Sequence, residues 1–435
     1  MYFKGGEAMA DVTTDQHKLI SDYIDKHKDE LIHYIQKAVQ IKSLVGQEQD
    51  MQQFMKERYE EIGLKVIESQ PNYEQVSKHE AFVDSGFPLE GRTNIVGIYE
   101  GSENAKSLTL HGHVDVVSAE PEEVWTYDPW GAEIVGNRMY GRGALDMKSG
   151  LLANWFALKA LLDLGLKPEG TVQLHSTIEE ESGGGGGALA LMEEGYITDG
   201  YITTEPHALR VTVAHSGVMY FRVKVVGKTA HAARTQEGIN AIGKMYKIYA
   251  ALEKLDRKRG EEVVFDLIHK ASDGRSCNLN IGTLRAGDWV SSVAGWAELE
   301  CRVGFIPGES RKEIKKLIEE TIAEAIAGDE WLEQHKPEIE WFGWSTEAWY
   351  QDPEHPYVQA FIESAKKTLG KDDIQIIGRT GGNDARFTQY YDKPGIGFGP
   401  DGEYSHGPDE YVEIDSIIET AKVLANHILD WTSSR

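Results

Sequence analysis

Cysteine is nearly absent from this sequence: Cys277 and Cys301 are the only two in 435 residues, and they do not form a CxxC pair. Neither a disulfide framework nor a thiolate metal site is therefore expected, and any metal ion would be held by nitrogen and oxygen atoms. No apolar run approaches the roughly 18 residues that a membrane span needs. No signal-peptide pattern opens the chain either. These absences favour a cytoplasmic protein without a membrane partner.

Basic residues are also scarce. Lys and Arg total 45 against 71 Asp and Glu, which gives a net charge of −26. Such a charge repels phosphate backbones and anionic lipid surfaces, so a nucleic-acid partner is not expected. The general interpretation of this charge is a solvated acidic surface. A hydrophobic fraction of 40% is that of a globular protein, and the length predicts at least two domains.

The first half of the chain alternates helical patterns with short apolar runs. Met1–Ala10 reads as a non-native extension before a native start near Met9, and it is excluded from the fold prediction. Two outer helices are expected over 15–45 and 51–63. Strands follow at 65–68, 94–99, 108–110, 171–175 and 200–203, with helical patterns at 150–164 and 188–194 between them. This alternation is typical of an α/β sheet covered on both faces.

The pattern changes after Glu205. Residues 216–342 read as strand, helix, strand, strand, helix, strand, which is the order of a ferredoxin-like split unit. The α/β pattern then resumes with helices at 356–369 and 414–431 and strands at 374–377 and 395–398. We therefore predict a discontinuous α/β domain with an inserted α+β domain. The predicted boundaries are 11–214 and 346–435 for the α/β domain and 215–345 for the insertion.

Ionisable side chains follow four of the predicted strands. His113 and Asp115 come after the strand at Leu108, the run Glu179–Glu181 after that at Thr171, Glu205 after that at Gly200, and His406 after that at Gly395. Ligands of open α/β sheets bind at the carboxyl ends of strands, so these groups are expected at one rim. A glycine-punctuated loop that opens the helix at Gly150 adds Asp146.

The charges of this group suit two divalent cations. Two such ions, the carboxylates of Asp146, Glu181 and Glu205, and one bridging hydroxide are neutral together, as a partly buried site requires. Two metals about 3.5–4 Å apart would share one carboxylate. Nitrogen and oxygen ligands suit zinc or a related ion. Asp115 is placed to fix the tautomer of the His113 ring. Glu180, beside a ligand, would be left free for general acid–base work.

Each of these signals also has a structural interpretation. A His-x-Asp after a strand is commonly a capped turn, and His111 or His175 fits a core position. An acidic triplet such as Glu179–Glu181 commonly begins a solvated helix. The glycine run Gly183–Gly187 could be a flexible linker or a phosphate cradle, although no P-loop lysine follows it. The joint placement at strand ends is what favours a metal site.

At this point the motifs resemble a known family closely. It is the family of two-zinc amidohydrolases and exopeptidases that includes acetylornithine deacetylase, succinyl-diaminopimelate desuccinylase, aminoacylase and bacterial glutamate carboxypeptidase. The resemblance covers the chain from about residue 15. It rests on seven motifs: Gly112–Val117 (GHVDVV), Tyr140–Gly150 (YGRGALDMKSG), Ile178–Gly183 (IEEESG), Thr204–Pro206 (TEP), Gly227–Ala232 (GKTAHA), Gly381–Arg386 (GGNDAR) and Tyr404–Gly407 (YSHG).

The resemblance implies a role for each matching residue. His113, Asp146 and Glu205 would hold one zinc, and Asp146, Glu181 and His406 the other, with a cis peptide at Asp146. Glu180 matches the general base and Asp115 the residue that orients His113. In the inserted domain, His231 would donate to the oxyanion, and in related dimers this histidine reaches the partner's site. Asn280, Arg302 and, in the GGNDAR motif, Gly382 would contact the substrate.

The implied protein is a homodimeric metallopeptidase-like deacylase. It would cleave the amide bond of a small N-acylated amino acid or related amine with a metal-bound hydroxide. A dipeptidase or carboxypeptidase, an aminopyrimidine deformylase and a non-catalytic metal-binding relative remain as alternatives. Cobalt or manganese could replace zinc. Two departures from the family pattern are Glu179 in place of the usual Asp, and Glu205, which resembles the deacylase and carboxypeptidase branch.

Overall fold

The computed structural model describes residues 14–433, and the extension Met1–Ala10 and the predicted domain start at residue 11 lie outside them. The described chain forms two compact units. The first contains the residues up to Val213 together with 351–376 and 383–433. The second contains Ala214–Tyr350 and Ile377–Gly382. The division into domains at 11–214 with 346–435 and at 215–345 stays a prediction.

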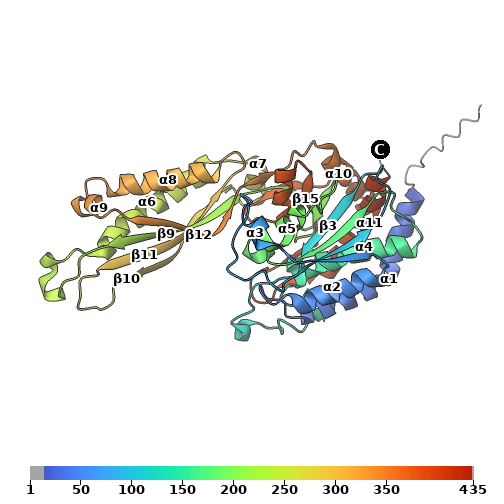
Figure 1. The fold of residues 1–435 in the computed structure, drawn as a ribbon, viewed down its shortest axis with the longest axis horizontal. Helices are drawn as coiled ribbons and strands as arrows, with labels where there is room; N and C mark the ends of the chain where they lie inside the picture. The colour runs from blue at the N-terminus through green and yellow to red at the C-terminus, as the bar shows by residue number, and fades with distance from the viewer. Residues whose placement is uncertain (1–13, 434–435) are drawn as a thin grey trace, which may run out of the picture. The chain divides into compact units, whose positions relative to one another are not determined.

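The first unit is built on a mixed sheet flanked by helices (Figure 1). Its helices are α1 (Thr14–Gln40), α2 (Gln49–Glu61), α3 (Tyr73–Val76), α4 (Ser149–Asp163), α5 (Ala190–Glu193), α10 (Pro356–Leu369) and α11 (Ile414–Thr432). Its main strands are β1 (Lys65–Ser69), β2 (Asn94–Tyr99), β3 (Leu108–His113), β6 (Val172–Thr177), β7 (Tyr201–Thr203), β8 (Val211–His215) and β15 (Gly395–Gly397). They pair in the order β1-β2-β6-β3-β7-β15-β8.

The centre of this sheet is parallel. In the register, His113 of β3 faces Thr177 of β6, and His111 of β3 faces Thr203 of β7. β15 also runs parallel to β7, with Gly397 opposite Thr203. All six residues of β3 are buried, because helices cover the sheet. The carboxyl ends of four strands therefore meet at one edge of the sheet, as predicted.

A second, small sheet joins two distant segments of the first unit. Its strands are β4 (Glu133–Val135), β5 (Arg138–Tyr140), β16 (Gly402–Glu403) and β17 (Tyr411–Glu413), in the order β16-β17-β5-β4. Tyr140 pairs with Tyr411, and the Gly141 amide donates to the Glu410 carbonyl at 2.9 Å. The loop after β5 is thus held beside the turn between β16 and β17.

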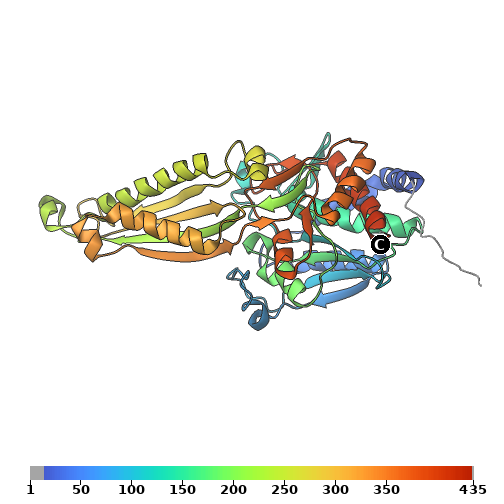
Figure 2. The same cartoon turned by 90° about the horizontal axis from the view of Figure 1, so that it is seen from above.

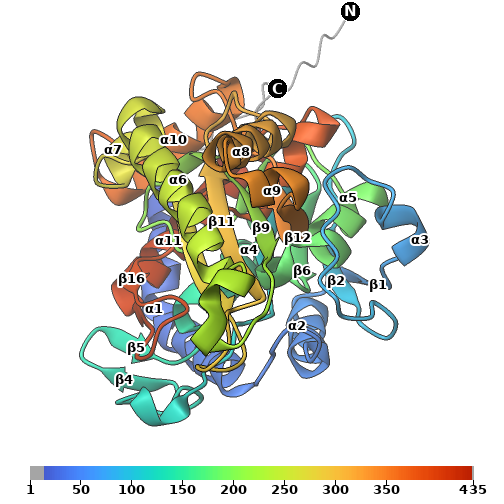
Figure 3. The same cartoon turned by 90° about the vertical axis from the view of Figure 1, so that its left-hand side faces the viewer.

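The second unit is a four-stranded antiparallel sheet with two long helices packed along it (Figures 2 and 3). Its elements are β9 (Gly217–Val226), α6 (Ala241–Glu262), α7 (Asp266–Ala271), β10 (Leu279–Ala286), β11 (Trp296–Phe305), α8 (Arg311–Ile326), α9 (Glu330–Gln334) and β12 (Glu338–Thr346). The strand order β10-β11-β9-β12 confirms the predicted ferredoxin-like unit. Its core includes the fully buried Phe221, Leu299 and Ile318.

The sequence pattern missed several short elements. β8 was not predicted, nor were the small sheet, α7, α9, β13 (Trp349–Tyr350) and the pairing of β14 (Ile376–Arg379) with β8. Strands of two to five residues contain too few positions for an alternation of apolar and polar residues to be visible. Within residues 14–433, no helix combines the length and the apolar character that crossing a membrane requires.

Candidate metal centre

Asp146 lies at the centre of two groups of ligand-type side chains. In the first group, the Nε2 atom of His113 is 3.4 Å from Oδ1 of Asp146 and 3.4 Å from Oε1 of Glu205. In the second, Nε2 of His406 is 3.4 Å from Oδ2 of Asp146 and 3.0 Å from Oε2 of Glu181. The two carboxylate oxygens of Asp146 thus face different imidazoles. This is the arrangement in which one carboxylate is shared between two ions.

The chain reaches this arrangement through close backbone approaches. Glu205 follows β7, where the Thr204 amide donates to the His111 carbonyl at 3.1 Å. A Cβ atom at Gly150 would lie 1.9 Å from the Thr204 carbonyl oxygen, so only glycine allows α4 to begin there. The peptide bond between Asp146 and Met147 is cis.

The His113 ring is oriented for metal binding. Its Nδ1 atom lies 2.9 Å from the backbone carbonyl oxygen of Asp115 and 3.5 Å from the Asp115 carboxylate. Because a carbonyl only accepts, Nδ1 carries a proton, and in the neutral ring Nε2 is left with a lone pair. His113 is fully buried, and its Nε2 atom has no hydrogen-bond partner among the described residues. A divalent cation would satisfy this atom, so the residues present fit the ions.

The Asp115 carboxylate has a further contact that the sequence did not suggest. Its two oxygens accept hydrogen bonds from the backbone amides of Glu180 and Glu181, at 3.2 and 3.0 Å. Asp115 therefore anchors the turn that presents both glutamates. The predicted orientation of His113 by Asp115 runs mainly through the Asp115 carbonyl. The role of its carboxylate toward the ring stays a prediction.

The site has an excess of negative charge. Burial and the neighbouring Asp146 raise the pKa of Glu181 to about 7. Burial and the carboxylates of Glu205 and Asp384 raise the pKa of Glu180 well above its usual range. Hydrogen bonds with Asp146 and Glu181 raise the pKa of His406 to about 11. Against the effect of burial, hydrogen bonds with His113 and His406 lower the pKa of Asp146. Glu180 and Glu181 thus resist ionisation, and nearby divalent cations would favour their charged forms.

A family comparison matches most of the chain. The model of Peptidase family M20/M25/M40 matches residues 109–430, a span that includes every residue of both ligand groups. The chain belongs to this family. It is accordingly a hydrolase of a metal-binding class, and the predicted relationship and enzyme class are confirmed.

Two sequence relatives of the M20 chain are named for different activities. The N-formyl-4-amino-5-aminomethyl-2-methylpyrimidine deformylase of Bacillus subtilis is 26% identical over 377 residues, which cover 81% of this chain and 86% of the relative. A Staphylococcus aureus protein named "Probable succinyl-diaminopimelate desuccinylase" is 28% identical over 355 residues, 76% of this chain and 84% of the relative. The chain thus spans most of the length of both.

Solved structures confirm the predicted fold. A tripeptidase from Staphylococcus aureus superposes with a TM-score of 0.73 at 23% identity, covering 94% of this chain and 99% of that one. A Bacillus subtilis protein, YxeP, described as a dinuclear metal-binding peptidase of the M20 family, gives a TM-score of 0.66 at 15% identity and covers 94% of this chain and 100% of that one. At these identities the likeness concerns the fold.

The remaining predicted site residues of the M20 chain lie in the second unit. Asn280 of β10 and Arg302 of β11 are direct partners in the antiparallel register, so their side chains share one face of the sheet. An Arg302 Nη2 atom donates to the Thr380 carbonyl at 3.1 Å, two residues before Gly382. These three predicted substrate contacts therefore lie in one part of the unit. His231 is exposed at the start of a short turn and is described below.

Two supporting residues were missed as functional. Glu410 accepts hydrogen bonds from the backbone amides of Leu145 and Asp146 at 3.0 and 3.1 Å, and it is paired with the buried Arg142 at 2.5 Å. This carboxylate fixes the backbone that carries Asp146. Arg142 lies inside the YGRGALDMKSG motif, but nothing in the sequence links it to a residue 268 positions later.

A second buried pair supports the glutamate turn. Glu179, the departure from the family's Asp, has a positive φ of 53° and accepts from the Gly186 amide at 2.8 Å and from Arg92 at 2.9 Å. Arg92 also bonds to the buried Glu48. Glu179 thus closes the glycine-rich loop on itself and ties it to another segment. The carboxylate beside the proposed general base is structural.

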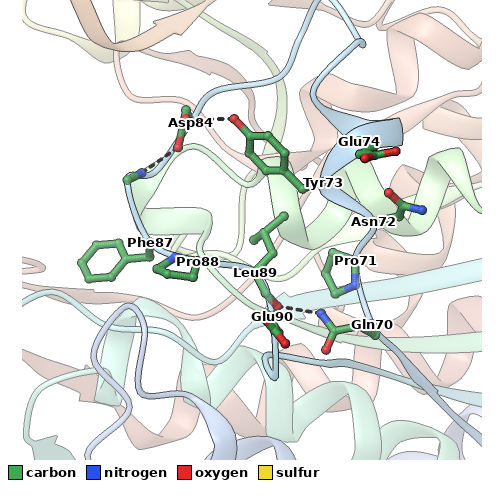
Figure 4. Close-up of a pocket in the computed structure, with 11 residues that line it drawn as sticks. Gln70, Pro71, Asn72, Tyr73, Glu74, Asp84, Phe87, Pro88, Leu89 and Glu90 are labelled. Atoms are coloured by element: carbon green, nitrogen blue, oxygen red, sulfur yellow. Dashed lines mark hydrogen bonds between the residues drawn. The ribbon is translucent and has the colours of Figure 1, made fainter.

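A surface pocket of about 670 Å³ lies between residues 70 and 90 of the first unit (Figure 4). None of the predicted site residues lines it. Its wall is internally bonded: Tyr73 donates to Asp84 at 3.2 Å, and Gln70 donates to the Leu89 carbonyl at 2.6 Å (Figure 4). A Cβ atom at Gly186 would lie 2.4 Å from the Leu89 side chain, so this segment packs directly against the glycine-rich loop. The segment 70–90 therefore contacts the glycine-rich loop, and it contains no predicted metal ligand or catalytic residue.

The two ligand groups predict a graded loss of metal. His406→Ala should reduce the bound divalent metal from two ions to about one per chain, because the second group would lose its only nitrogen while the first stays complete. Elemental analysis of dialysed protein measures this. His33→Ala, a change at an exposed position of α1, should leave two ions bound. Two ions in both variants would contradict the assignment.

Proposed function

We propose that the protein is a two-metal deacylase that hydrolyses the amide bond of a small N-acylated amino acid or related amine. The observation that carries this proposal is the carboxylate of Glu180. It lies beside the two ligand groups, is 6% exposed, and its Oε1 atom has no hydrogen-bond partner among the described residues. The nearest cation to this atom in the described chain is Nη1 of Arg386 at 3.7 Å, beyond hydrogen-bond distance, so Oε1 can accept a proton from a reacting water.

The residues that would hold the metals are those of the two groups, His113, Asp146 and Glu205, and Asp146, Glu181 and His406. Zinc is the ion proposed, with cobalt or manganese as substitutes, since the ligands are nitrogen and oxygen. Bound there, two such ions would supply Lewis-acid polarisation of a carbonyl and a lowered pKa of water. Elemental analysis of protein purified without added metal distinguishes the ions. A stoichiometry below one would contradict the proposal.

Glu180 would move protons during the reaction. Its free Oε1 atom accepts the proton of the attacking water, and the resulting carboxylic acid donates it to the departing amine. The turn that carries Glu180 is held by two contacts. The Asp115 carboxylate accepts from the Glu180 amide, and the Glu179 carboxylate accepts from the Gly186 amide. The carboxylate therefore keeps its position through both transfers.

His231 has the tautomer of a hydrogen-bond donor. Its Nδ1 atom accepts from the Ala233 backbone amide at 3.0 Å. In the neutral ring the proton is then on Nε2, which can donate to the oxyanion of a tetrahedral intermediate. This supports the role proposed for His231 from the family resemblance, in which it acts on the active site of a partner subunit.

A homodimer would fit the surface of the second unit. Trp289 and Val290 in its β10–β11 loop are 71% and 92% exposed, and Tyr246 of α6 is 70% exposed. Large apolar side chains in water favour association.

The cytoplasmic location stays a proposal that fits two buried free cysteines, and cell fractionation tests it.

Glu180→Ala should keep both metal ions and the fold while its hydrolysis rate falls by at least about 10²-fold, because acid–base groups contribute about 10²–10⁴-fold. The measurement is amine release from a panel of formyl, acetyl, succinyl and aminoacyl amides by metal-replete protein. Glu60→Ala, at an exposed position of α2, is the matched control and should be fully active. Unchanged turnover in the Glu180 variant would sink the mechanism.

Arg302 separates the candidate substrates. If the substrate carries a carboxylate, Arg302→Ala should raise KM about 10–100-fold on carboxylated amides, because a charge-assisted pair is lost, and leave uncarboxylated amides unaffected. Arg285→Ala, at an exposed position of the neighbouring strand β10, is the control. Equal kinetics of both variants on every carboxylated amide, with good turnover of a formylated aminopyrimidine, would instead favour the deformylase. The 26% identity to such an enzyme keeps that second candidate open.

Mixing two inactive variants tests the dimer and His231 together. Chains with Glu180→Ala and chains with His231→Ala should each be inactive alone. When unfolded together and refolded, they should regain activity, because a mixed dimer has one site with both residues intact. Sedimentation should give twice the chain mass. A monomer that is fully active would contradict the proposed dimer.

A further inference from the structure

The turn that bears Glu180 continues into the glycine-rich run Gly183–Gly187, and residues 179–187 are here called the glycine-rich loop. This loop packs against a short helical turn, η6 (Asp384–Tyr391), that the proposed mechanism does not use. Its side chains Asp384 and Arg386 are 0% and 2% exposed. The two segments fit closely: a Cβ atom at Gly184 would lie 2.4 Å from an oxygen of Asp384, and Gly184 has a positive φ of 65°. A side chain at Gly184 would collide with Asp384, so this packing requires glycine there.

The Arg386 guanidinium contacts this loop at two levels. Its Nη2 atom donates to the backbone carbonyl of Gly183 at 2.8 Å. Its Nη1 atom lies 3.7 Å from Oε1 of Glu180 and 3.4 Å from Oδ1 of Asp384. A guanidinium is planar and rigid, so a group fixed at one nitrogen has a fixed position at the other. The same cation therefore sets both the loop backbone and the place of the Glu180 carboxylate.

Asp384 in turn holds the guanidinium. Its other carboxylate oxygen, Oδ2, is 3.1 Å from Nε2 of the fully buried His111, which packs on Tyr201. The row His111, Asp384, Arg386, Glu180 thus runs from the core of the sheet to the site. The distances of 3.4 and 3.7 Å are those of ion pairs rather than of direct hydrogen bonds. Glu180 stays free to accept a proton.

We propose that Arg386 is a positioning residue for the general base, with its guanidinium holding the Glu180 carboxylate in the orientation in which it meets the reacting water. This inference rests on the proposed function of Glu180. Arg386 does not reach the substrate in this scheme, and it binds no metal. It acts through Glu180 and the loop, and Asp384 keeps it in place.

The experiment compares Arg386→Met and Arg386→Lys with wild type, each with two metal ions bound as checked by elemental analysis. A misplaced catalytic group costs up to about 10²-fold, so kcat of Arg386→Met should fall by about that factor while KM changes less than about threefold. Arg386→Lys retains the charge but not the fork, so its kcat should lie between the two. Hydrogen exchange of peptide 179–187 should rise in Arg386→Met, because the Gly183 carbonyl loses its donor.

Arg259→Met is the matched control for the loss of a buried arginine. Arg259 is 9% exposed and makes a bidentate pair with Glu309 at 2.9 and 2.7 Å in the second unit. Its removal should lower the unfolding temperature and leave kcat unchanged. If Arg386→Met does not fold, Arg386→Lys decides, because a reduced kcat at unchanged KM and metal content is still required.

Two results would overturn the inference: wild-type kcat in both Arg386 variants, or a loss of kcat that follows a loss of metal. Failure of the proposed function looks different. In that case Glu180→Ala keeps its turnover, or the wild-type protein hydrolyses no amide in the panel. An inactive Glu180→Ala beside a fully active Arg386→Met would reject the positioning role alone.

Discussion

The carboxylates around Asp146 repel one another, and the surrounding elements hold them together against this repulsion. Asp146, Glu181 and Glu205 are brought to the same two imidazoles, and Glu180 adds a fourth carboxyl group beside them. Each group loses hydration on burial, and each disfavours the ionisation of the others. Such a cluster persists only if rigid elements hold it and cations neutralise it. The parallel strands, the small sheet and the glycine-dependent backbone contacts supply the rigidity.

Buried arginines complete the support, with one behind Asp146 and two at the turn Glu179–Glu181. Arg142 pairs with the carboxylate that binds the Asp146 amide, Arg92 joins Glu179 to Glu48, and Arg386 faces Glu180. Removing one partner of a buried pair typically costs about 3–5 kcal/mol, because the remaining charge is left without compensation. These pairs connect segments far apart in the sequence. They fix the positions of individual carboxylate oxygens within the fold of this M20 hydrolase.

Much of this was predictable because the chemistry is local in sequence. The strand at Leu108 is an apolar run that ends in His113, and Glu205 and Glu181 follow the ends of two other strands. Parallel strands in register then bring those ends together. The alternation of strands and helices in residues 216–342 was equally direct, since its strands are eight to ten residues long. Shorter strands such as β8 and β16 show no readable pattern, so the small sheet that places His406 was missed.

Residue types and their spacing were enough to predict the candidate donors, the order of the longer elements and a preference for nitrogen and oxygen ligands over thiolates. The contacts between individual atoms became known from the fold. It placed the two oxygens of Asp146 on different histidines, assigned the Asp115 carboxylate to two backbone amides, and put Glu410 behind Asp146 and Arg386 beside Glu180. Such pairings join residues up to a few hundred positions apart. Their distances depend on the packing of whole elements, which no local pattern records.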